Sequence, residues 1–503
     1  MAFPGPPAQI VETHVSVIAM IGDRAYKLLK PVDLGFLDHR RREDRLAACR
    51  RETEVNRRFA PDVYLGVLDV VDADGAPRDH LVEMRRLPPE RSLSRLLETP
   101  EREDLVREVA RTVAGFHRAS PTSERIREAG TPAALRGLWE EGLDALADRA
   151  PGVVAAHDVE RARALAREYI AGRAPLLERR MADGWVRDGH GDILCDDVFC
   201  MPDGPRVLDC LAFDDRLRHG DVLADVAFLA MDLEARGHPE LSRLLVDAWA
   251  AELDEAHPAS LEHHHVAYRA HVRSKVAALR SVQGDPEAAG RARALHALAL
   301  DRLERGRVRL VLVGGAPGTG KSTVAEGLAR AEGWRVLGTD PIRREGAGPS
   351  PAGLDQGAYA PAAVAAVYEE LLRRAGALLE MGESVVLDAS WGREAERERA
   401  RGLAGAHRAE LAEIRCALDP EAAAARVAAR AAAGGGASDA TPEIARALAA
   451  RADPWPAAHT LDTGGAPESV VAGARALLVA SRLVRTPPGG SPDTRVDPRP
   501  YAR

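Results

Sequence analysis

The segment RVRLVLVGGAPGTGKST, residues 307–323, constrains the fold of this chain more than any other stretch. An apolar run leads into a glycine-rich loop, and a helix-forming sequence follows. The pattern GxxxxGK[ST] is complete from Gly315 to Ser322 and predicts a P-loop, whose backbone N–H groups surround phosphate oxygens. The segment therefore predicts a parallel α/β sheet with a nucleotide site at its carboxyl edge.

Within this loop we expect the nucleotide phosphates to be held by Gly315, Ala316, Pro317, Gly318, Thr319, Gly320, Lys321, Ser322 and Thr323. Lys321 is the expected catalytic cation on the β- and γ-phosphates, and Ser322 the expected hydroxyl ligand of Mg²⁺. ATP and Mg²⁺ are thus the predicted cofactors. Strand-like stretches at 308–313, 334–338, 384–388, 413–418 and 459–462 alternate with helical segments, as in a parallel sheet.

Two carboxylates follow strands of this predicted sheet. Asp388 ends the apolar run SVVLD, where a carboxylate would lie near Mg²⁺. An ordinary cap of the next turn is the alternative. Asp340, in LGTDPIRREG, is a candidate catalytic group that would orient an acceptor hydroxyl or take its proton, and an N-cap before Pro341 explains it equally well.

Arg426 and Arg430 lie one helical turn apart before a triple glycine. Arginines on such a segment would close over a triphosphate and stabilise the transferring charge. A solvated helix face is the alternative, because arginine is abundant in this chain.

Composition limits the class of protein. The chain of 503 residues is 46% hydrophobic and 29% charged, and no apolar run is long enough to cross a bilayer. With no basic-then-apolar leader at the N-terminus, we expect a cytoplasmic protein without a membrane partner. The net charge of -8 disfavours nucleic acid as a partner. Five scattered cysteines suggest neither a disulfide framework nor a zinc site.

Lysine and asparagine are rare in this chain. It has four lysines among 69 basic residues, and Asn56 is its one asparagine. Where arginine replaces lysine so widely, lysine should persist at positions that need a compact ammonium group. Lys27 and Lys321 occupy such positions.

The N-terminal half shows a different order of elements. HVSVIAMIGDRAYKLLK (14–30) and YLGVLDVVDADGAPRDHLVEMRRL (64–87) each predict two strands around a turn, with a charged helix between them. Residues 92–182 and 221–305 have helical patterns, and strand-like stretches fill 186–213. The histidines at 263–265 fall in a helical stretch and predict a polar face rather than a metal site.

Four residues of this half match the needs of a kinase-like site. Lys27 ends the strand RAYK and would bind phosphates, and Glu52 in the following helix would hold that lysine. Asp192, in GHGDILCDDVFC (189–200), is the expected catalytic base, and Asp209 the expected metal ligand. The alternative is a retained scaffold whose carboxylates only make structural hydrogen bonds.

These segments, with RRETEVNRRFAPDVYLGV, resemble the aminoglycoside-phosphotransferase-like family, most closely members fused to a C-terminal P-loop domain. GGAPGTGKST, TDPIRRE and VVLDASW resemble P-loop, AAA-type ATP-binding domains akin to small-molecule kinases. The resemblance implies an α+β kinase-like domain (1–300), an α/β P-loop NTPase domain (306–484) and a disordered tail (485–503).

The catalytic loop departs from the pattern HGD-L-H-x-x-N of the family: Leu194 replaces the second histidine, and Asp197 replaces the metal-binding asparagine. Asp197 still offers an oxygen ligand to Mg²⁺. We therefore expect phosphoryl transfer from ATP to a small-molecule hydroxyl at the P-loop domain. The first domain would hold a second kinase-like site, either a second phosphotransferase site or a degenerate one. The alternative is a regulatory ATPase switch with a pseudokinase sensor or binding domain. The acceptor and the oligomeric state stay open.

Overall fold

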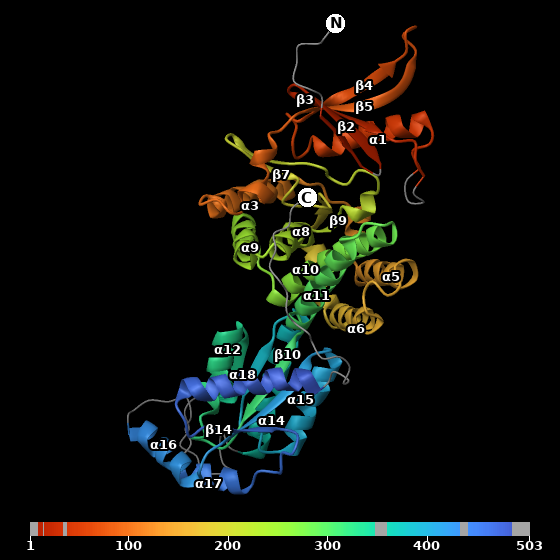
Figure 1. Ribbon diagram of the computed structural model, residues 1–503. Coiled ribbons are helices and arrows are strands. Elements are labelled where there is room, and N and C mark those ends of the chain that lie inside the picture. Colours follow the sequence, from red (N-terminus) through yellow and green to blue (C-terminus); the bar gives the residue numbers. More distant parts are fainter. Residues whose placement is uncertain (1–8, 14, 34–37, 348–359, 433–440, 485–503) are drawn as a thin grey trace. The chain divides into compact units, whose positions relative to one another are not determined.

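The chain forms two compact units, which are described separately. The computed structural model describes residues 9–13, 15–33, 38–347, 360–432 and 441–484. Unit 1 comprises residues 1–164, 177–257 and 262–304, and unit 2 comprises 165–176, 258–261 and 305–503. Figure 1 gives the labels used below.

Unit 1 begins with a five-stranded antiparallel sheet in the order β1-β2-β3-β5-β4. Its strands are β1 (Gln9–Glu12), β2 (Ser16–Ile21), β3 (Arg24–Leu29), β4 (Tyr64–Val71) and β5 (Pro77–Arg85). Helix α1 (Arg42–Asn56) connects β3 to β4 and lies against the sheet, since Cys49 shares a core with Leu29 and Val82. This packing fixes one face of α1 toward the strands.

The rest of unit 1 is mainly helical (Figure 1). Its helices are α2 (Leu93–Leu96), α3 (Arg102–Ala119), α4 (Glu124–Arg127), α5 (Pro132–Arg149), α6 (Ala156–Gly172), α7 (Ala174–Ala182), α8 (Val222–Ala235), α9 (Pro239–Leu253), α10 (Ala259–Val282) and α11 (Ala288–Arg305), with short 3₁₀ turns at Pro89–Arg91, Glu128–Gly130 and Asp215–Leu217. Helix α8 is buried nearly all round, as its apolar sequence VLADVAFLAMDLEA requires.

Two small antiparallel sheets carry the loops of interest in unit 1. One pairs β6 (Val186–Asp188) with β9 (His219–Asp221), and the other pairs β7 (Val198–Met201) with β8 (Gly204–Val207). The segment GHGDILCDDVFC therefore starts directly after β6 and runs into β7.

Unit 2 is a parallel α/β fold in the strand order β11-β12-β10-β13-β14. The strands are β10 (Arg309–Gly314), β11 (Arg335–Gly338), β12 (Val385–Asp388), β13 (Glu410–Ala417) and β14 (His459–Asp462). The helices are α12 (Lys321–Glu332), α13 (Thr339–Ala347), α14 (Pro361–Glu380), α15 (Glu394–Ala406), α16 (Pro420–Ala432), α17 (Pro442–Ala450) and α18 (Pro467–Val484). Apolar side chains of α12 and α18 share one core with the central strands.

The predicted fold class is confirmed in both units. All five parallel strands of unit 2 lie where the pattern placed them, although β13 begins at Glu410 rather than at 413. The prediction for the histidines was wrong in part, because His264 and His265 are buried on α10 rather than part of a polar face. The predicted tail 485–503 lies outside the described residues.

All five cysteines are buried and free. Among the residues that the structure describes, no helix is long and apolar enough to cross a membrane.

Candidate active sites

The P-loop of unit 2 follows β10 and leads directly into α12. Gly315, Gly318 and Gly320 have φ values of 146°, 88° and 83°, in a backbone region that residues other than glycine rarely adopt. A Cβ at Gly318 would lie 2.2 Å from the carbonyl oxygen of Ala423, so the loop is closely packed as well as curled. The Thr319 hydroxyl donates to the Ala316 carbonyl at 2.8 Å and closes the turn.

Asp388 lies at the carboxyl end of β12, beside Val313 of β10 and Gly338 of β11. Its Oδ1 atom is buried and has no hydrogen-bond partner among the described residues. Burial raises the pKa of Asp388, while the charge of Lys321 and a hydrogen bond with Ser322 oppose that shift. The structure thus brings together three residues that sequence reasoning assigned to one phosphate and metal site.

Asp340 follows β11 and lies in the first turn of α13, so its predicted place beyond a strand end holds. Its carboxylate accepts a hydrogen bond from Arg343 at 2.6 Å. Asp340 also acts on the pKa of Asp388, which places the two carboxylates near each other at one edge of the sheet. Arg343 was not predicted, and its spacing of three residues along a helix was the available signal.

Arg426, on α16, reaches the P-loop region through Thr463. Its guanidinium donates to the Thr463 carbonyl at 3.2 Å, and the Thr463 hydroxyl donates to the Thr319 carbonyl at 2.6 Å. Arg430 is on the same helix, but the described residues offer it no such contact. The triple glycine that follows this helix lies outside the described residues.

In unit 1 the predicted lysine–glutamate pair is formed. The Lys27 ammonium on β3 donates to Glu52 of α1 at 2.7 Å and lies 3.6 Å from Asp209. Burial alone would lower the pKa of Lys27, but the Glu52 and Asp209 carboxylates raise it above its ordinary value. Asp209 has a φ of 62°, and its N–H donates to the Tyr64 hydroxyl at 3.2 Å. A left-handed non-glycine residue at this point is strained backbone of the kind found at functional sites.

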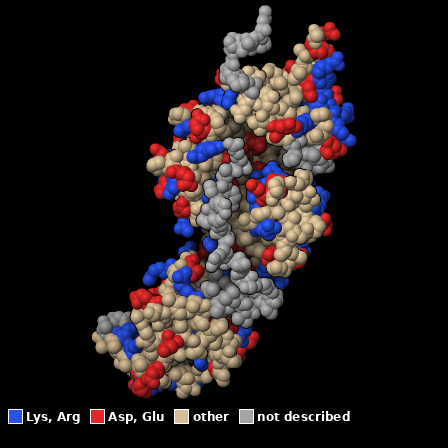
Figure 2. Space-filling view, in the orientation of Figure 1, with Lys and Arg blue, Asp and Glu red and all other residues tan. Residues whose placement is uncertain are grey.

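Asp192 and Asp197 join Asp209 in an acidic cluster, since Asp209 acts on the pKa of both. Figure 2 shows that acidic atoms of unit 1 are visible in a recess of its surface. Burial raises the pKa of Asp192, and Arg273 opposes the shift with an ion pair at 3.4 Å. Burial, Asp209 and Asp192 together raise the pKa of Asp197 well above its usual range. Two carboxylates that resist ionisation beside a third favour a bound cation.

Asp225 of α8 holds the loop that follows β6. Its carboxylate accepts the N–H groups of His190 at 2.7 Å and Gly191 at 2.8 Å, and it contacts the ring of His117 at 3.0 Å. Burial would raise the pKa of Asp225, but these contacts keep it below its ordinary value. Asp225 therefore positions the backbone that carries Asp192, a role that sequence reasoning missed.

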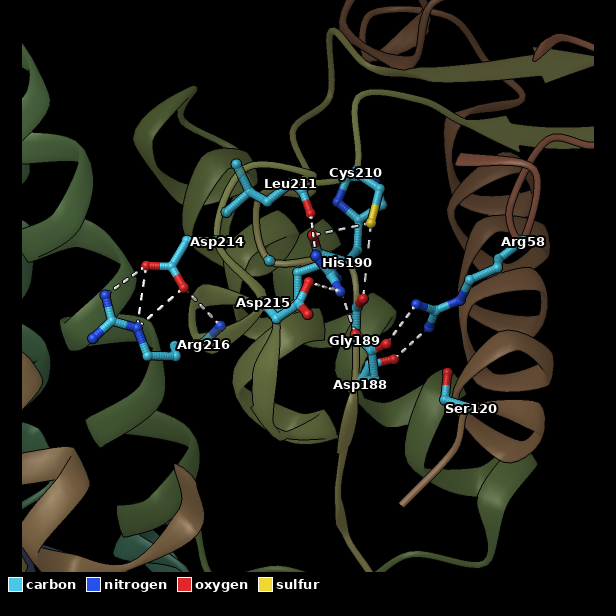
Figure 3. Close-up of polar contacts among 12 residues, drawn as sticks. Arg58, Ser120, Asp188, Gly189, His190, Cys210, Leu211, Asp214, Asp215 and Arg216 are labelled. Atoms are coloured by element: carbon cyan, nitrogen blue, oxygen red, sulfur yellow. Dashed lines mark hydrogen bonds and ion pairs between the residues drawn. The ribbon is translucent and has the colours of Figure 1, made fainter. Parts of the chain in front are cut away.

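Figure 3 shows how the same loop is attached to α1 and to the segment after Asp209. Arg58, just beyond α1, pairs with Asp188 at 2.8 Å. The Leu211 N–H donates to the His190 carbonyl at 3.1 Å, and burial lowers the pKa of His190 to about 4. His190 is thus a neutral structural residue of the loop.

The described residues contain no group of three or more His, Cys, Asp or Glu side chains arranged to hold a metal ion. Mg²⁺ bound with a nucleotide needs few protein ligands, because phosphate oxygens and water supply the rest. The unpartnered Oδ1 atoms of Asp388 and Asp192 and the raised pKa of Asp197 fit such a partly coordinated cation in each unit.

Sequence comparison finds relatives that match nearly the whole chain. The chain is 40% identical over 475 residues to the uncharacterized protein Rv2004c of Mycobacterium tuberculosis, covering 93% of this chain and 94% of Rv2004c. The chain therefore belongs to the same family as Rv2004c. The uncharacterized protein Mb2027c of Mycobacterium bovis matches at the same identity and coverage. The AAA domain family matches residues 310–455, which contain the P-loop, Asp340, Asp388 and Arg426.

Several solved structures resemble parts of this chain. A choline/ethanolamine kinase family protein from Mesorhizobium loti is 15% identical, covers 59% of this chain and 92% of its own, and gives a TM-score of 0.37. The structure of the GDP and kanamycin complex of APH(2")-IIia is 15% identical, covers 60% of this chain and 94% of its own, and gives a TM-score of 0.38. The Mycobacterium tuberculosis APS kinase CysC, solved with AMPPNP and APS, is 22% identical, covers 34% of this chain and 98% of its own, and gives a TM-score of 0.27. At these TM-scores the likenesses decide nothing about what this chain binds.

Proposed function

We propose that this chain is an ATP-dependent phosphotransferase that moves the γ-phosphoryl group of ATP to a hydroxyl of a small molecule at the P-loop of unit 2. The observation that carries the proposal is the buried, unpartnered Oδ1 of Asp388 beside Lys321 and Ser322. A carboxylate at a strand end next to a P-loop lysine and serine is the arrangement that Mg·ATP requires.

The residues divide the work as follows. The P-loop backbone and Lys321 hold the phosphates, and Ser322 and Asp388 would hold Mg²⁺, which neutralises phosphate charge. Asp340, kept in place by Arg343, orients the acceptor hydroxyl and takes its proton. Arg426, beside Thr463 and the P-loop, stabilises the transferring group.

Transfer of ³²P from γ-labelled ATP to small molecules of a protein-free metabolite extract tests the proposal. Lys321→Ala should abolish transfer at this site and Asp388→Asn should reduce it by about a hundredfold or more. The matched control is Lys30→Ala, because Lys30 pairs with Glu12 in unit 1 and is no part of the P-loop site of unit 2. ATP hydrolysis at a rate that no added acceptor changes would favour a regulatory switch instead.

A second candidate function is a nucleotide-dependent kinase site in unit 1. The specific observation in its favour is the Lys27–Glu52 pair with Asp209 beside it, because an intact pair distinguishes active kinase-like sites. Asp192 would serve as base, and Asp197 and Asp209 would hold Mg²⁺. Calorimetric titration with Mg·AMPPNP should give two sites on the intact chain, one on Lys321→Ala and none when Lys27→Met is added. A single site on the intact chain, lost in Lys321→Ala, would reject this second function.

A further inference from the structure

Two arginines of α10 act on the carboxylate expected to serve as base in unit 1, and one of them pairs with it. The Arg273 guanidinium lies 3.4 Å from Asp192, at the long end of a hydrogen bond. Arg269 lies one helical turn earlier, on the same face of α10, and its charge also acts on the pKa of Asp192. Both charges therefore converge on the place where an acceptor hydroxyl must lie.

These arginines retain binding capacity. Arg269 donates its Nε–H to the Ala224 carbonyl at 2.8 Å and packs over the ring of Phe228, while Asp192 is the one hydrogen-bond partner of Arg273 among the described residues. A guanidinium has five N–H donors, so most of those on both residues remain available. The side chains of Arg273 and Asp192 are 27% and 25% exposed, so a small molecule can reach both.

The nucleotide does not need these cations. Lys27 already lies beside Asp209 on the sheet side of the site and is the phosphate-binding cation expected there. Asp232, another carboxylate that acts on Asp192, is itself occupied by the Cys195 N–H and by Arg236. The positive charge of α10 is therefore left for the acceptor.

We propose that Arg273 and Arg269 form an anion subsite in unit 1, so that the hydroxyl compound phosphorylated there carries a phosphate or carboxylate group. Arginine suits this role because its planar fork matches both anions in a bidentate manner. The same charges repel a polycationic acceptor of the aminoglycoside kind. This inference rests on the second candidate function.

The reaction balances with ATP as the co-reactant. The acceptor oxygen bonds to the γ-phosphorus while the bond from that phosphorus to the β,γ-bridging oxygen breaks. ADP leaves with that electron pair, and the hydroxyl proton passes to Asp192. The anionic group of the acceptor stays on the arginines and turns the hydroxyl toward Asp192.

The test uses the full chain carrying Lys321→Ala, so that only unit 1 can bind nucleotide. A titration with Mg·AMPPNP comes first: absence of binding would reject the site itself and the inference with it. Inorganic phosphate is then titrated into the AMPPNP-loaded protein, where the nucleotide already fills its own phosphate positions. We expect one phosphate site, weakened about ten- to a hundredfold by Arg273→Gln, as for loss of a hydrogen bond to a charged group.

Arg280→Gln is the matched control, because Arg280 is exposed on the same helix, about two turns beyond Arg273. It should leave phosphate binding unchanged. No phosphate binding to a nucleotide-loaded protein, or equal binding in Arg273→Gln, would overturn the anion subsite and leave the kinase site standing. Two comparisons of turnover then identify the anionic group of the acceptor. Faster turnover of glucose 6-phosphate than of glucose indicates a phosphate group, and faster turnover of glycerate than of glycerol indicates a carboxylate group. Faster turnover of kanamycin than of these anionic compounds would also overturn the inference.

Discussion

Asp225 offers the sharpest test of how unit 1 positions its catalytic loop. Its carboxylate is buried and accepts two backbone N–H groups, those of His190 and Gly191, and it also contacts His117. In Asp225→Asn the side chain keeps its size but loses its charge, and its NH₂ group must face a backbone donor. At least one buried N–H is then left without an acceptor.

The cost follows from these contacts. Hydrogen bonds to a charged group contribute about 1.5–3 kcal/mol each, and a buried donor without a partner costs about 1–3 kcal/mol. We therefore expect Asp225→Asn to lower the free energy of unfolding by about 3–5 kcal/mol, measured by urea denaturation. Displacement of the loop by about 1 Å should reduce turnover at unit 1 by about a hundredfold.

Turnover of the variant is measured in the Lys321→Ala background, where ADP formation measures the activity of unit 1 alone. Affinity for Mg·AMPPNP should change little, because Lys27, Glu52 and Asp209 are untouched. Asp247→Asn, on the exposed face of α9, is the control and should alter neither stability nor turnover. An Asp225→Asn protein as stable and as active as its parent would refute the view that this carboxylate holds the loop.

Three further predictions concern the loop glycines, the lysine and the buried histidines. Gly318→Ala should weaken Mg·AMPPNP binding to unit 2 at least tenfold by calorimetry, because a Cβ at a φ of 88° would lie 2.2 Å from a carbonyl oxygen. Lys27→Arg should reduce turnover at unit 1 by about a hundredfold, since a planar guanidinium does not reproduce the compact contact with Glu52 at 2.7 Å. Burial lowers the pKa of His265 to about 4 and of His271 to about 3, so the unfolded chain binds more protons below about pH 6.5. Urea midpoints of unit 1 should therefore fall as pH falls from about 6.5 toward 4, and His271→Phe should flatten that slope.

Much of each site could be predicted because short segments of sequence determine the positions of its residues. The P-loop depends on glycines at fixed spacing, and Lys27 and Glu52 follow from a strand and the next helix. Asp225 and Arg273 could not be predicted in the same way, because they lie on helices 33 and 81 residues after Asp192 and approach it only through tertiary packing. The domain boundaries proposed near residues 300 and 306 stay a prediction.

The rarity of asparagine in this chain also indicates a structurally demanding position, that of Asn56. It is the one asparagine of the chain and is fully buried, accepting the Cys210 N–H at 2.8 Å and donating to the Glu52 carbonyl at 3.0 Å. A buried position that needs a donor and an acceptor on one short side chain cannot take arginine, aspartate or alanine. The reasoning that singled out rare lysines therefore extends to this residue, which joins α1 to the segment after Asp209.

The two sites share one electrostatic arrangement despite their unrelated folds. In unit 2, half-buried Asp388 has a raised pKa that Lys321 opposes, and in unit 1, half-buried Asp192 has a raised pKa that Arg273 opposes. In each case the carboxylate has few partners among the described residues, and a cation or a substrate proton would supply another. The replacement of asparagine by Asp197 adds negative charge to unit 1 and so strengthens this demand rather than removing it. A degenerate scaffold would gain stability by losing such charges, so their presence beside an intact Lys27–Glu52 pair favours a working site.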